Sequence, residues 1–376
     1  MNNNLNIKKF TVILFLSFIF VVPTINILTE DKKVSETENK ILTTFPELSF
    51  DSILSKRFMS SFDKYTSDQF PMRETFIQSK NIFSYAVGQR EFRNIYLADD
   101  RLVEKFEFNE DILSQNLMNI GDISTFMKNK HDINSTVAII PTSVEFYKDK
   151  LPSYALNDSQ SDALMFSSEL LKNYDIDRFY TPYKVLNNHK DDYIYFNTDH
   201  HWTQLGAYIS YLDMFGYDIK YSSLFDNYNE VSDSFFGTYN TKVLLPSIKP
   251  DSIYSYSNFN DNNIVVDFEN EYDTLYDDTK LDTKNQYQYF LHGDPAFAVI
   301  DGNKNTASEL IIFKDSYAHC FIPFLTNEYS KIHVVDPRYY DIDLDTYLRE
   351  NPNIDSALFF NNINQLNTEI TYKNKV

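Results

Sequence analysis

The last third of the chain alternates short apolar runs with segments of helical spacing, and this pattern restricts the fold more than any other. Continuous apolar runs occupy residues 310–313 and 357–360, and residues 332–336 are apolar apart from His333 and Asp336, with helical spacing between these stretches at 318–325 and 343–349. Continuous apolar runs are typical of strands covered on both faces, and strand–helix alternation favours parallel pairing. The sequence therefore predicts an α/β fold: a three-layer core with a mainly parallel sheet.

The middle of the chain extends this pattern and then interrupts it. Residues 221–308 are rich in Asp, Asn and Tyr and contain only short alternating stretches. We interpret them as an inserted strand- and loop-rich segment that covers the core. Further strands are predicted at 137–141 and 193–196, and further helices at 51–82 with a break at Pro71, 103–130, 159–173 and 203–215.

The N-terminus carries an uncharged, mostly apolar stretch at residues 10–28. As a helix it would extend about 28 Å, close to the thickness of a bilayer core. Lys8 and Lys9 precede it, which favours a cytoplasmic N-terminus and an exported remainder. We expect a cytoplasmic tip and signal anchor (1–29), a stalk (30–50) and a catalytic domain (51–376). A cleaved signal peptide and a buried core helix are the alternatives.

Composition narrows the classes of function. The formal net charge of −20 argues against nucleic acid as a partner, because phosphate binding needs a basic surface. Cys320 is the only cysteine, so an internal disulfide and a cysteine metal cluster are excluded. With seven glycines and no Gly-rich phosphate loop, the chain gives no reason to expect a cofactor. The export pattern without disulfides suits a Gram-positive bacterium.

Two segments carry the residues of a nucleophilic site. Asp199 and His201 are two apart, so in an extended segment both side chains project to one side, and the carboxylate can orient the imidazole as a base. Ser316 follows an apolar strand at a strand-to-helix turn, where backbone N–H groups can stabilise an oxyanion. Asp336 and Asn361 also follow strand ends, where ligands bind in parallel sheets. We predict a triad of Ser316, His201 and Asp199.

Each of these residues also has a simpler interpretation. Asp-Ser after a strand is commonly a helix cap, and Asp-x-His is commonly a surface pair. Asp199, His200 and His201 could instead bind zinc, although adjacent histidines rarely converge on one ion. We therefore expect no metal.

Several neighbours could contact substrate or an oxyanion. Trp202 is better explained as a core residue, or as a brace for the imidazole, than as a stacking surface for a sugar. Cys320 is best explained as a packed, unreactive thiol. Arg338 could bind substrate or form a surface ion pair. The side-chain amide of Asn361 or Asn362 could add an oxyanion donor. The candidates for substrate and oxyanion contacts are Tyr317, Arg338, Asn361, His200 and Trp202.

These segments resemble a known family. Thr198-Asp199-His200-His201-Trp202-Thr203, followed by Gly206, is similar to the motif of the DHHW family of bacterial exported proteins. The supporting segments are Glu38-Asn39-Lys40 through Phe45-Pro46-Glu47, Ser67-Asp68-Gln69-Phe70-Pro71-Met72-Arg73, Pro141-Thr142-Ser143, Phe236-Gly237-Thr238, Lys314-Asp315-Ser316-Tyr317 and Asp336-Pro337-Arg338-Tyr339-Tyr340.

The resemblance has consequences for fold and activity. The DHHW family looks like a relative of the alginate O-acetyltransferases, whose catalytic domain is SGNH-hydrolase-like. Carried over, Asp199, His201 and Ser316 become the catalytic triad, with Lys314 in place of a glycine before Asp315.

The implied function is extracytoplasmic transfer of an acetyl group through an acyl-serine to a hydroxyl of a cell-surface or secreted polysaccharide. A membrane-bound O-acyltransferase would supply the acetyl group, and the N-terminal helix would hold the enzyme at the cell membrane as a single-pass protein. The alternatives are an acetyl esterase with the same triad and a non-catalytic glycan-binding or scaffold protein of an export complex.

Overall fold

The computed structural model describes residues 2–35 and 40–372, with side chains described from residue 7 onward. Glu38 and Asn39 of the predicted stalk, and residues 373–376 of the predicted catalytic domain, lie outside this range. The chain divides into two compact units, Met1–Gln89 with Thr241–Ser247 and Arg90–Asn240 with Ile248–Val376. The domain boundaries that the sequence suggests stay a prediction.

The second unit is built on an eight-stranded sheet with the order β11-β10-β12-β14-β13-β15-β6-β7. The five strands from β14 to β7 are parallel, and β11, β10 and β12 add antiparallel pairs at one edge. The strands are β6 (Asn134–Ile140), β7 (Arg178–Tyr180), β10 (Ile264–Val266), β11 (Asn270–Tyr272), β12 (Phe297–Asp301), β13 (Glu309–Lys314), β14 (Lys331–Val335) and β15 (Ile354–Asn362).

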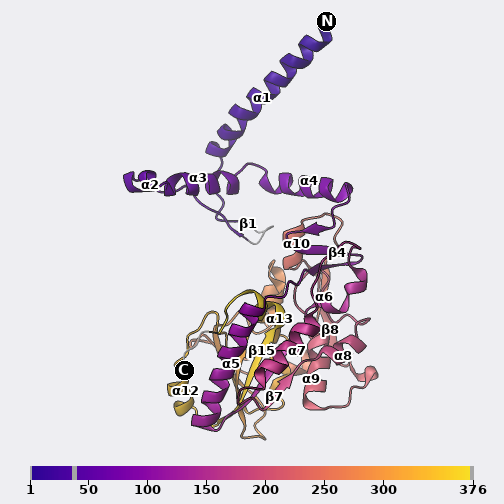
Figure 1. Ribbon diagram of the computed structural model, residues 1–376, viewed down its shortest axis with the longest axis vertical. Coiled ribbons are helices and arrows are strands. Elements are labelled where there is room, and N and C mark those ends of the chain that lie inside the picture. The colour runs from indigo at the N-terminus through magenta and orange to yellow at the C-terminus, as the bar shows by residue number, and fades with distance from the viewer. Residues whose placement is uncertain (1, 36–39, 373–376) are drawn as a thin grey trace. The chain divides into compact units, whose positions relative to one another are not determined.

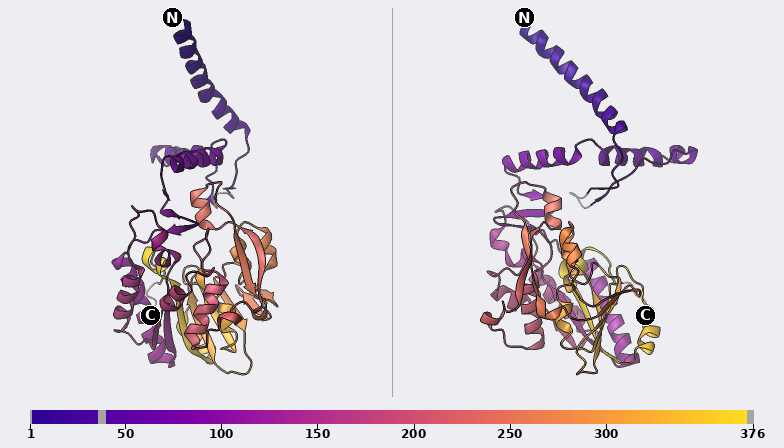
Figure 2. Two further views of the ribbon diagram at one scale, coloured as in Figure 1. Left: turned by 90° about the vertical axis from the view of Figure 1, so that its right-hand side faces the viewer. Right: turned by 180° about the vertical axis from the view of Figure 1, so that it is seen from behind.

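Alternate residues of each central strand enter two different cores. On β13, Leu310 and Ile312 pack into one cluster while Ile311 and Phe313 pack into the other. Helix α9 (Gln204–Phe215) covers the first face, and α5 (Glu110–His131) and α7 (Gln160–Leu171) cover the second. Figures 1 and 2 show α5 and α7 beside β15. The predicted three-layer α/β fold with a mainly parallel sheet is confirmed.

Smaller elements complete the second unit. A three-stranded sheet and a hairpin flank the core, and part of the segment 221–308 enters the central sheet through β10, β11 and β12. Its remaining strands and α-helices are β3 (Glu91–Phe92), β4 (Ile95–Ala98), β5 (Arg101–Glu104), β8 (Tyr228–Phe235), β9 (Asp251–Tyr256), α6 (Ser143–Phe146), α8 (Tyr183–Asn188), α11 (Ile322–Leu325), α12 (Leu344–Glu350) and α13 (Ile363–Thr368). Helix α10 (Thr238–Val243) begins in the second unit and ends in the segment assigned to the first.

Three local predictions were wrong. The helix expected at 103–130 begins only at Glu110, after the Asn109 side chain caps it, and Val103 lies in β5. Residues 193–196 form no strand beyond the single bridge between Tyr195 and Trp202. The helix expected at 318–325 divides into a 3₁₀ turn, Ser316–Ala318, and α11.

The first unit contains the apolar helix α1 (Asn2–Leu28), β1 (Val34–Ser35), β2 (Lys40–Ile41), α2 (Phe50–Leu54), α3 (Arg57–Asp68) and α4 (Arg73–Ala86). Residues Ile7–Leu28 have a mean hydropathy of 2.4, and none of the most apolar part is buried. This helix is compatible with a single-pass anchor or with a signal sequence. The predicted break at Pro71 lies between α3 and α4.

Candidate active site

The histidine motif lies on a loop that a buried carboxylate holds in place. Asp251 accepts hydrogen bonds from the Asn197 N–H at 2.8 Å and from the Thr198 N–H and Oγ1 at 2.7 and 2.6 Å. The Tyr193 hydroxyl donates to the same carboxylate at 2.7 Å. This carboxylate comes from β9, more than fifty residues later in the chain, so sequence spacing gave no indication of it.

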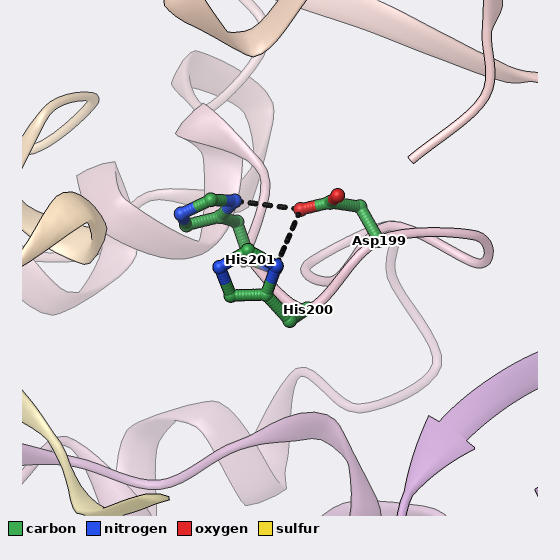
Figure 3. A group of neighbouring side chains, drawn as sticks. All are labelled: Asp199, His200 and His201. Atoms are coloured by element: carbon green, nitrogen blue, oxygen red, sulfur yellow. Dashed lines mark hydrogen bonds and ion pairs between the residues drawn. The ribbon is translucent and has the colours of Figure 1, made fainter. Parts of the chain in front are cut away.

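Asp199 and His201 form a buried pair at the tip of this loop. Asp199 Oδ1 accepts from the His201 backbone N–H at 3.0 Å and lies 2.6 Å from His201 Nδ1. Asp199 Oδ2 accepts from the Thr238 N–H at 2.7 Å. Figure 3 shows the rings of His200 and His201 both meeting one oxygen of this carboxylate. The shared oxygen fixes the orientation of the His201 ring.

The other ring nitrogen of His201 meets the serine that the sequence selects. His201 Nε2 lies 2.7 Å from Ser316 Oγ, although the two residues are 115 positions apart. Asp199, His201 and Ser316 therefore form one continuous chain of hydrogen bonds. This is the arrangement in which a carboxylate orients a base and the base activates a hydroxyl.

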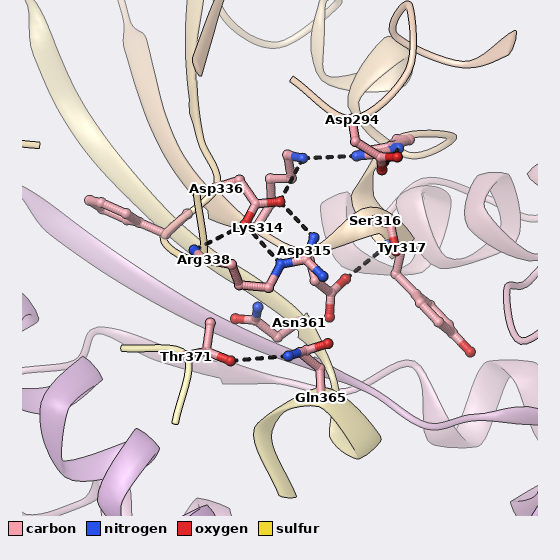
Figure 4. Close-up of polar contacts among 12 residues, drawn as sticks. Asp294, Lys314, Asp315, Ser316, Tyr317, Asp336, Arg338, Asn361, Gln365 and Thr371 are labelled. Atoms are coloured by element: carbon pink, nitrogen blue, oxygen red, sulfur yellow. Dashed lines mark hydrogen bonds and ion pairs between the residues drawn. The ribbon is translucent and has the colours of Figure 1, made fainter. Parts of the chain in front are cut away.

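Ser316 opens the 3₁₀ turn that follows β13, and Asp315 fixes this turn (Figure 4). Asp315 accepts from the Tyr317 N–H at 2.8 Å and from the Asn362 N–H and Nδ2 at 2.7 and 2.8 Å. The Tyr317 N–H is thereby taken, whereas the first N–H groups of a helical turn lack partners inside the turn. The Ser316 N–H is thus a candidate backbone donor for an oxyanion.

Burial and neighbouring charge set the ionisation of the pair. Burial lowers the pKa of His201 to about 4, and the adjacent His200 adds to the effect while Asp199 opposes it. Burial alone would raise the pKa of Asp199, but His200 and His201 hold it well below its usual range. At neutral pH the pair is therefore a carboxylate and a neutral imidazole, which is the state of a general base.

Tyr287 covers the imidazole, and sequence reasoning missed it. Its ring stacks on His201 with centroids 3.7 Å apart and planes 9° apart. Its hydroxyl donates to the Ser316 carbonyl at 3.0 Å. Tyr287 comes from the segment 221–308, whose predicted covering role it supports at this one point.

Gly237 permits the closest backbone approach in the site. A Cβ at this position would lie 2.2 Å from Asp199 Cβ and 2.5 Å from Asp199 Oδ2. The Gly237 N–H donates to Thr198 Oγ1 at 2.9 Å. The segment Phe236-Gly237-Thr238 was noted in the sequence, but without an alignment its glycine had no assigned role.

A buried charged cluster lies behind the serine turn. Lys314 Nζ contacts Asp336 Oδ2 at 3.1 Å and His319 Nε2 at 2.8 Å, and Lys314 and Asp336 side chains are fully buried. Arg338 binds the same carboxylate with two bonds, at 2.9 and 2.7 Å. Lys314, which the resemblance sets against a glycine, ends β13 and directs its side chain into this cluster.

The remaining candidates lie at different places. His200 is part exposed, and its Nδ1 lies 2.7 Å from Thr238 Oγ1. Trp202 is a core residue that stacks on Phe321 and donates to the Tyr317 carbonyl at 2.9 Å. The Tyr317 hydroxyl donates to the His200 carbonyl, so this ring braces the histidine loop.

Asn361 and Cys320 are both buried. Asn361 accepts from the Tyr372 hydroxyl at 2.7 Å, and within residues 2–35 and 40–372 its Nδ2 has no partner. It does not line the cavity described below, whereas Asn362 does. Burial raises the pKa of the Cys320 thiol to about 12, as expected of a packed thiol.

Ser316 opens into a cavity of about 860 Å³ that is lined largely by polar side chains. His200, Tyr317 and Arg338 line it beside the serine. Its amide and carboxylate residues are Asn94, Glu104, Glu107, Asn109, Glu110, Asp111, Asn362, Asn364, Gln365 and Asn367.

Asp199, His200 and His201 also form a candidate metal group, with ligand atoms within 4.8 Å of one another. Three protein ligands and an open position would suit catalytic zinc. However, His201 Nδ1 already faces the carboxylate and Nε2 already faces Ser316. The geometry favours a hydrogen-bonded triad over a metal centre.

Several solved structures of bacterial proteins are similar to this chain. A DHHW protein from Eubacterium siraeum DSM 15702 shares 22% identity and a TM-score of 0.61, covering 74% of this chain and 92% of that one. Bacillus cereus PatB1 shares 20% identity and a TM-score of 0.57, covering 74% and 99%. The O-acetyltransferase domain of Pseudomonas putida AlgJ shares 13% identity and a TM-score of 0.45, covering 73% and 93%.

No curated protein matches the chain. The family model described as DHHW protein matches residues 86–335, which is more than half of the chain and includes the histidine motif. The resemblance noted in the sequence is therefore confirmed, and the chain belongs to the DHHW family.

Proposed function

We propose that this chain is an exported O-acetyltransferase that moves an acetyl group through Ser316 to a hydroxyl of a cell-surface or secreted polysaccharide. The observation that carries the proposal is the continuous hydrogen-bonded chain from Asp199 through His201 to Ser316. Its last atom opens into a polar cavity large enough for sugar residues.

In the first half-reaction His201 Nε2 takes the proton of Ser316 as Oγ attacks the donor's acetyl carbonyl. The Ser316 N–H stabilises the tetrahedral oxyanion, and His201 returns the proton to the leaving group as the acyl-serine forms. A pKa of about 4 keeps His201 neutral and ready to accept that proton at neutral pH.

In the second half-reaction a glycan hydroxyl gives its proton to His201 and attacks the acyl-serine. The acetyl ester of the sugar leaves, and Ser316 recovers its proton. Transfer exceeds hydrolysis only where the hydroxyl is held in place and water is excluded. The amide groups of Asn362, Asn364 and Gln365 offer the hydrogen bonds that position hydroxyl groups.

The location and the partner complete the proposal. Helix α1 would hold the enzyme at the outer face of the cell membrane as a single-pass anchor. A membrane-bound O-acyltransferase would deliver the acetyl group there, and no cofactor is required by the chemistry.

Release of acetate from p-nitrophenyl acetate by the full-length chain in detergent tests the nucleophile. We expect Ser316→Ala and His201→Ala each to lose on the order of 10³-fold or more of kcat/KM. Ser234→Ala, which changes an exposed serine on β8, should match the wild type. Equal rates for Ser316→Ala and wild type would remove the enzyme and leave the scaffold or glycan-binding role.

A sulfonyl reagent gives an independent test, because a solved structure of B. cereus PatB1 carries a sulfonyl adduct. Treatment of this chain with phenylmethylsulfonyl fluoride should produce one adduct, on the peptide that contains Ser316. The His201→Ala variant should form it far more slowly, since its hydroxyl lacks a base.

An acceptor distinguishes transfer from hydrolysis. With a neutral oligosaccharide present, the wild type should yield acetylated sugar, detected by mass spectrometry, at the expense of free acetate. Free acetate alone, with any of several acceptors, would identify an esterase instead.

A further inference from the structure

The end of the apolar helix is tied to the junction between α3 and α4. Asn26 Nδ2, in the last turn of α1, donates to the Gln69 carbonyl at 2.6 Å. The Gln69 side chain accepts from the Lys32 N–H at 3.0 Å and donates to the Lys32 carbonyl at 2.9 Å. The Tyr65 hydroxyl donates to Asp31 at 3.1 Å. If α1 spans a bilayer, these hydrogen bonds hold the α3–α4 junction next to the point where α1 leaves the bilayer.

Helix α4 presents an apolar stripe to solvent. Phe76 and Phe83 are seven residues apart, which places them on one side of α4, and Met72 and Val87 flank the two ends of the helix. The exposed fractions of Met72, Phe76, Phe83 and Val87 are 70%, 55%, 68% and 67%. Asn81 lies on the opposite side, where it is buried and donates to the Val243 carbonyl at 2.8 Å.

A second group of exposed apolar side chains lies along α2 and α3. Phe50, Ile53, Leu54 and Met59 are 77%, 51%, 68% and 57% exposed. In the same segment Phe58, Phe62 and Tyr65 pack with Phe45, which is itself 58% exposed, in an aromatic cluster. So many exposed apolar side chains on neighbouring helices indicate a surface that contacts a membrane or another protein in the cell.

The charge of these helices differs from that of the chain as a whole. Residues 50–87 contain five basic and four acidic side chains, whereas the whole chain carries a net charge of −20. Bacterial membrane surfaces are anionic, and an acidic segment would be repelled from them. The segment attached to the apolar helix is thus the one whose charge permits close contact with lipid.

We propose that α2, α3 and α4 form an interfacial collar, defined as residues 50–87, that lies on the outer surface of the bilayer with its apolar side chains among the headgroups and upper acyl chains. The inference rests on the anchoring part of the proposed function and is independent of the acetyl transfer. Amphipathic helices bind bilayers in this way, with apolar side chains buried and polar side chains facing water.

Lipid is the partner that we propose for the apolar surface of the collar, because the collar follows in sequence the helix proposed to span the membrane. The hydrogen bonds that Asn26 and Lys32 donate to Gln69 hold the α3–α4 junction within one helical turn of the point where α1 ends. At that depth the first apolar material the side chains meet is the bilayer.

Fluorescence quenching in liposomes tests the collar. Cysteine replaces Phe76 or Phe83 in the full-length chain, and an environment-sensitive nitrobenzoxadiazole label is attached; Cys320 is buried and should not react. The labelled chain is reconstituted into vesicles of phosphatidylglycerol and phosphatidylcholine that contain nitroxide-labelled lipid. Met165→Cys on α7 provides a matched control, because Met165 is an apolar residue with 63% exposure in the other unit.

We expect the labels at 76 and 83 to be quenched by nitroxide lipid and shielded from aqueous iodide, and the label at 165 to show the reverse. Labels at 76 and 83 that iodide quenches as strongly as the label at 165 would overturn the proposal. Shielding from iodide without quenching by lipid would also overturn it, and would indicate a protein partner or second copy on this surface.

The acetate-release assay on the same reconstituted samples keeps the two proposals distinguishable. A catalytically inactive chain whose labels at 76 and 83 are quenched by lipid supports the collar and counts only against the acetyl transfer. A double variant, Phe76→Glu with Phe83→Glu, should retain α1 in the membrane yet lose lipid quenching of a label at Met72→Cys, because two charges resist burial.

Discussion

Replacing Gly237 by alanine should disable the proposed base without touching any reacting atom. The new Cβ would lie 2.2 Å from Asp199 Cβ, whereas ordinary contact begins at 3.4 Å. The Asp199 backbone or the Gly237 backbone must therefore move by about 1.2 Å, the difference between these two distances. A displacement of about 1 Å in a catalytic group costs on the order of 10²-fold in rate.

The same displacement also weakens the fold. It strains the bonds from the Gly237 N–H to Thr198 and from the Thr238 N–H to Asp199, which are 2.9 and 2.7 Å long. Overpacking of this kind costs about 1–3 kcal/mol in the free energy of unfolding. A loss of activity must therefore be separated from a loss of stability.

Gly216→Ala supplies the matched control. Gly216 ends α9 with φ of 72° and has open space around its Cα, so alanine there is strained but displaces no neighbour. Its cost of about 1–2 kcal/mol is similar. In urea denaturation both variants should lose comparable stability, while kcat/KM for p-nitrophenyl acetate should fall only in Gly237→Ala. Equal kcat/KM in the two variants would refute the role assigned to the close approach.

Two further predictions follow from buried charge. His201 must be neutral to accept a proton, and its pKa is lowered to about 4, so kcat/KM should rise as the pH increases through about 4 and then stay level to neutrality. Tyr287→Ala admits water to the imidazole and should move the midpoint of this rise toward 6.5, the ordinary pKa of histidine. An unchanged pH–rate profile in this variant would contradict the argument that burial lowers the pKa. Asp336→Ala leaves the Lys314 ammonium buried without its carboxylate and should lower the free energy of unfolding by about 3–5 kcal/mol. Lys314→Met leaves Asp336 paired with Arg338 and should cost less in the same urea titration, so equal losses would count against this account.

The sequence predicted the sheet well where strands are buried on both faces. Strands β6, β13 and β15 contain continuous apolar runs, and only His333 interrupts that of β14, because alternate residues enter two different cores. Val103 was misassigned to a helix because its short strand pairs with β4 in a small sheet, where local spacing is ambiguous.

The predicted pairing of Asp199 with His201 is present, but its structural cause differs from the one we expected. We expected strand alternation to place both side chains on one side, but the loop forms no strand there. Instead Asp199 Oδ1 accepts from the His201 backbone N–H, a local turn that brings the carboxylate to the ring. Whether Ser316, His201 and Asp199 are catalytic stays a prediction until the assays above are made.

Other parts of the site had no sequence indication. Asp251 and Tyr287 reach the motif across 53 and 86 residues, and neither lies in a recognisable pattern. Such long-range contacts depend on how the segment 221–308 packs in the folded protein. From its composition we could conclude only that this segment is polar and aromatic. Local propensity contains no information on which of its many tyrosines meets the imidazole.

The distance of 115 residues between the imidazole and the hydroxyl has a consequence for biogenesis. On the proposed topology the polypeptide is exported with its N-terminal part leading, so the histidine loop emerges long before Ser316. Strand β13 also needs β14 and β15 on either side, and both are synthesised after it. On the proposed function, no reactive serine would exist while the chain is in transit. The enzyme would become competent only after β15 has been secreted and has docked beside β13, which would confine acyl chemistry to the compartment that holds the glycan.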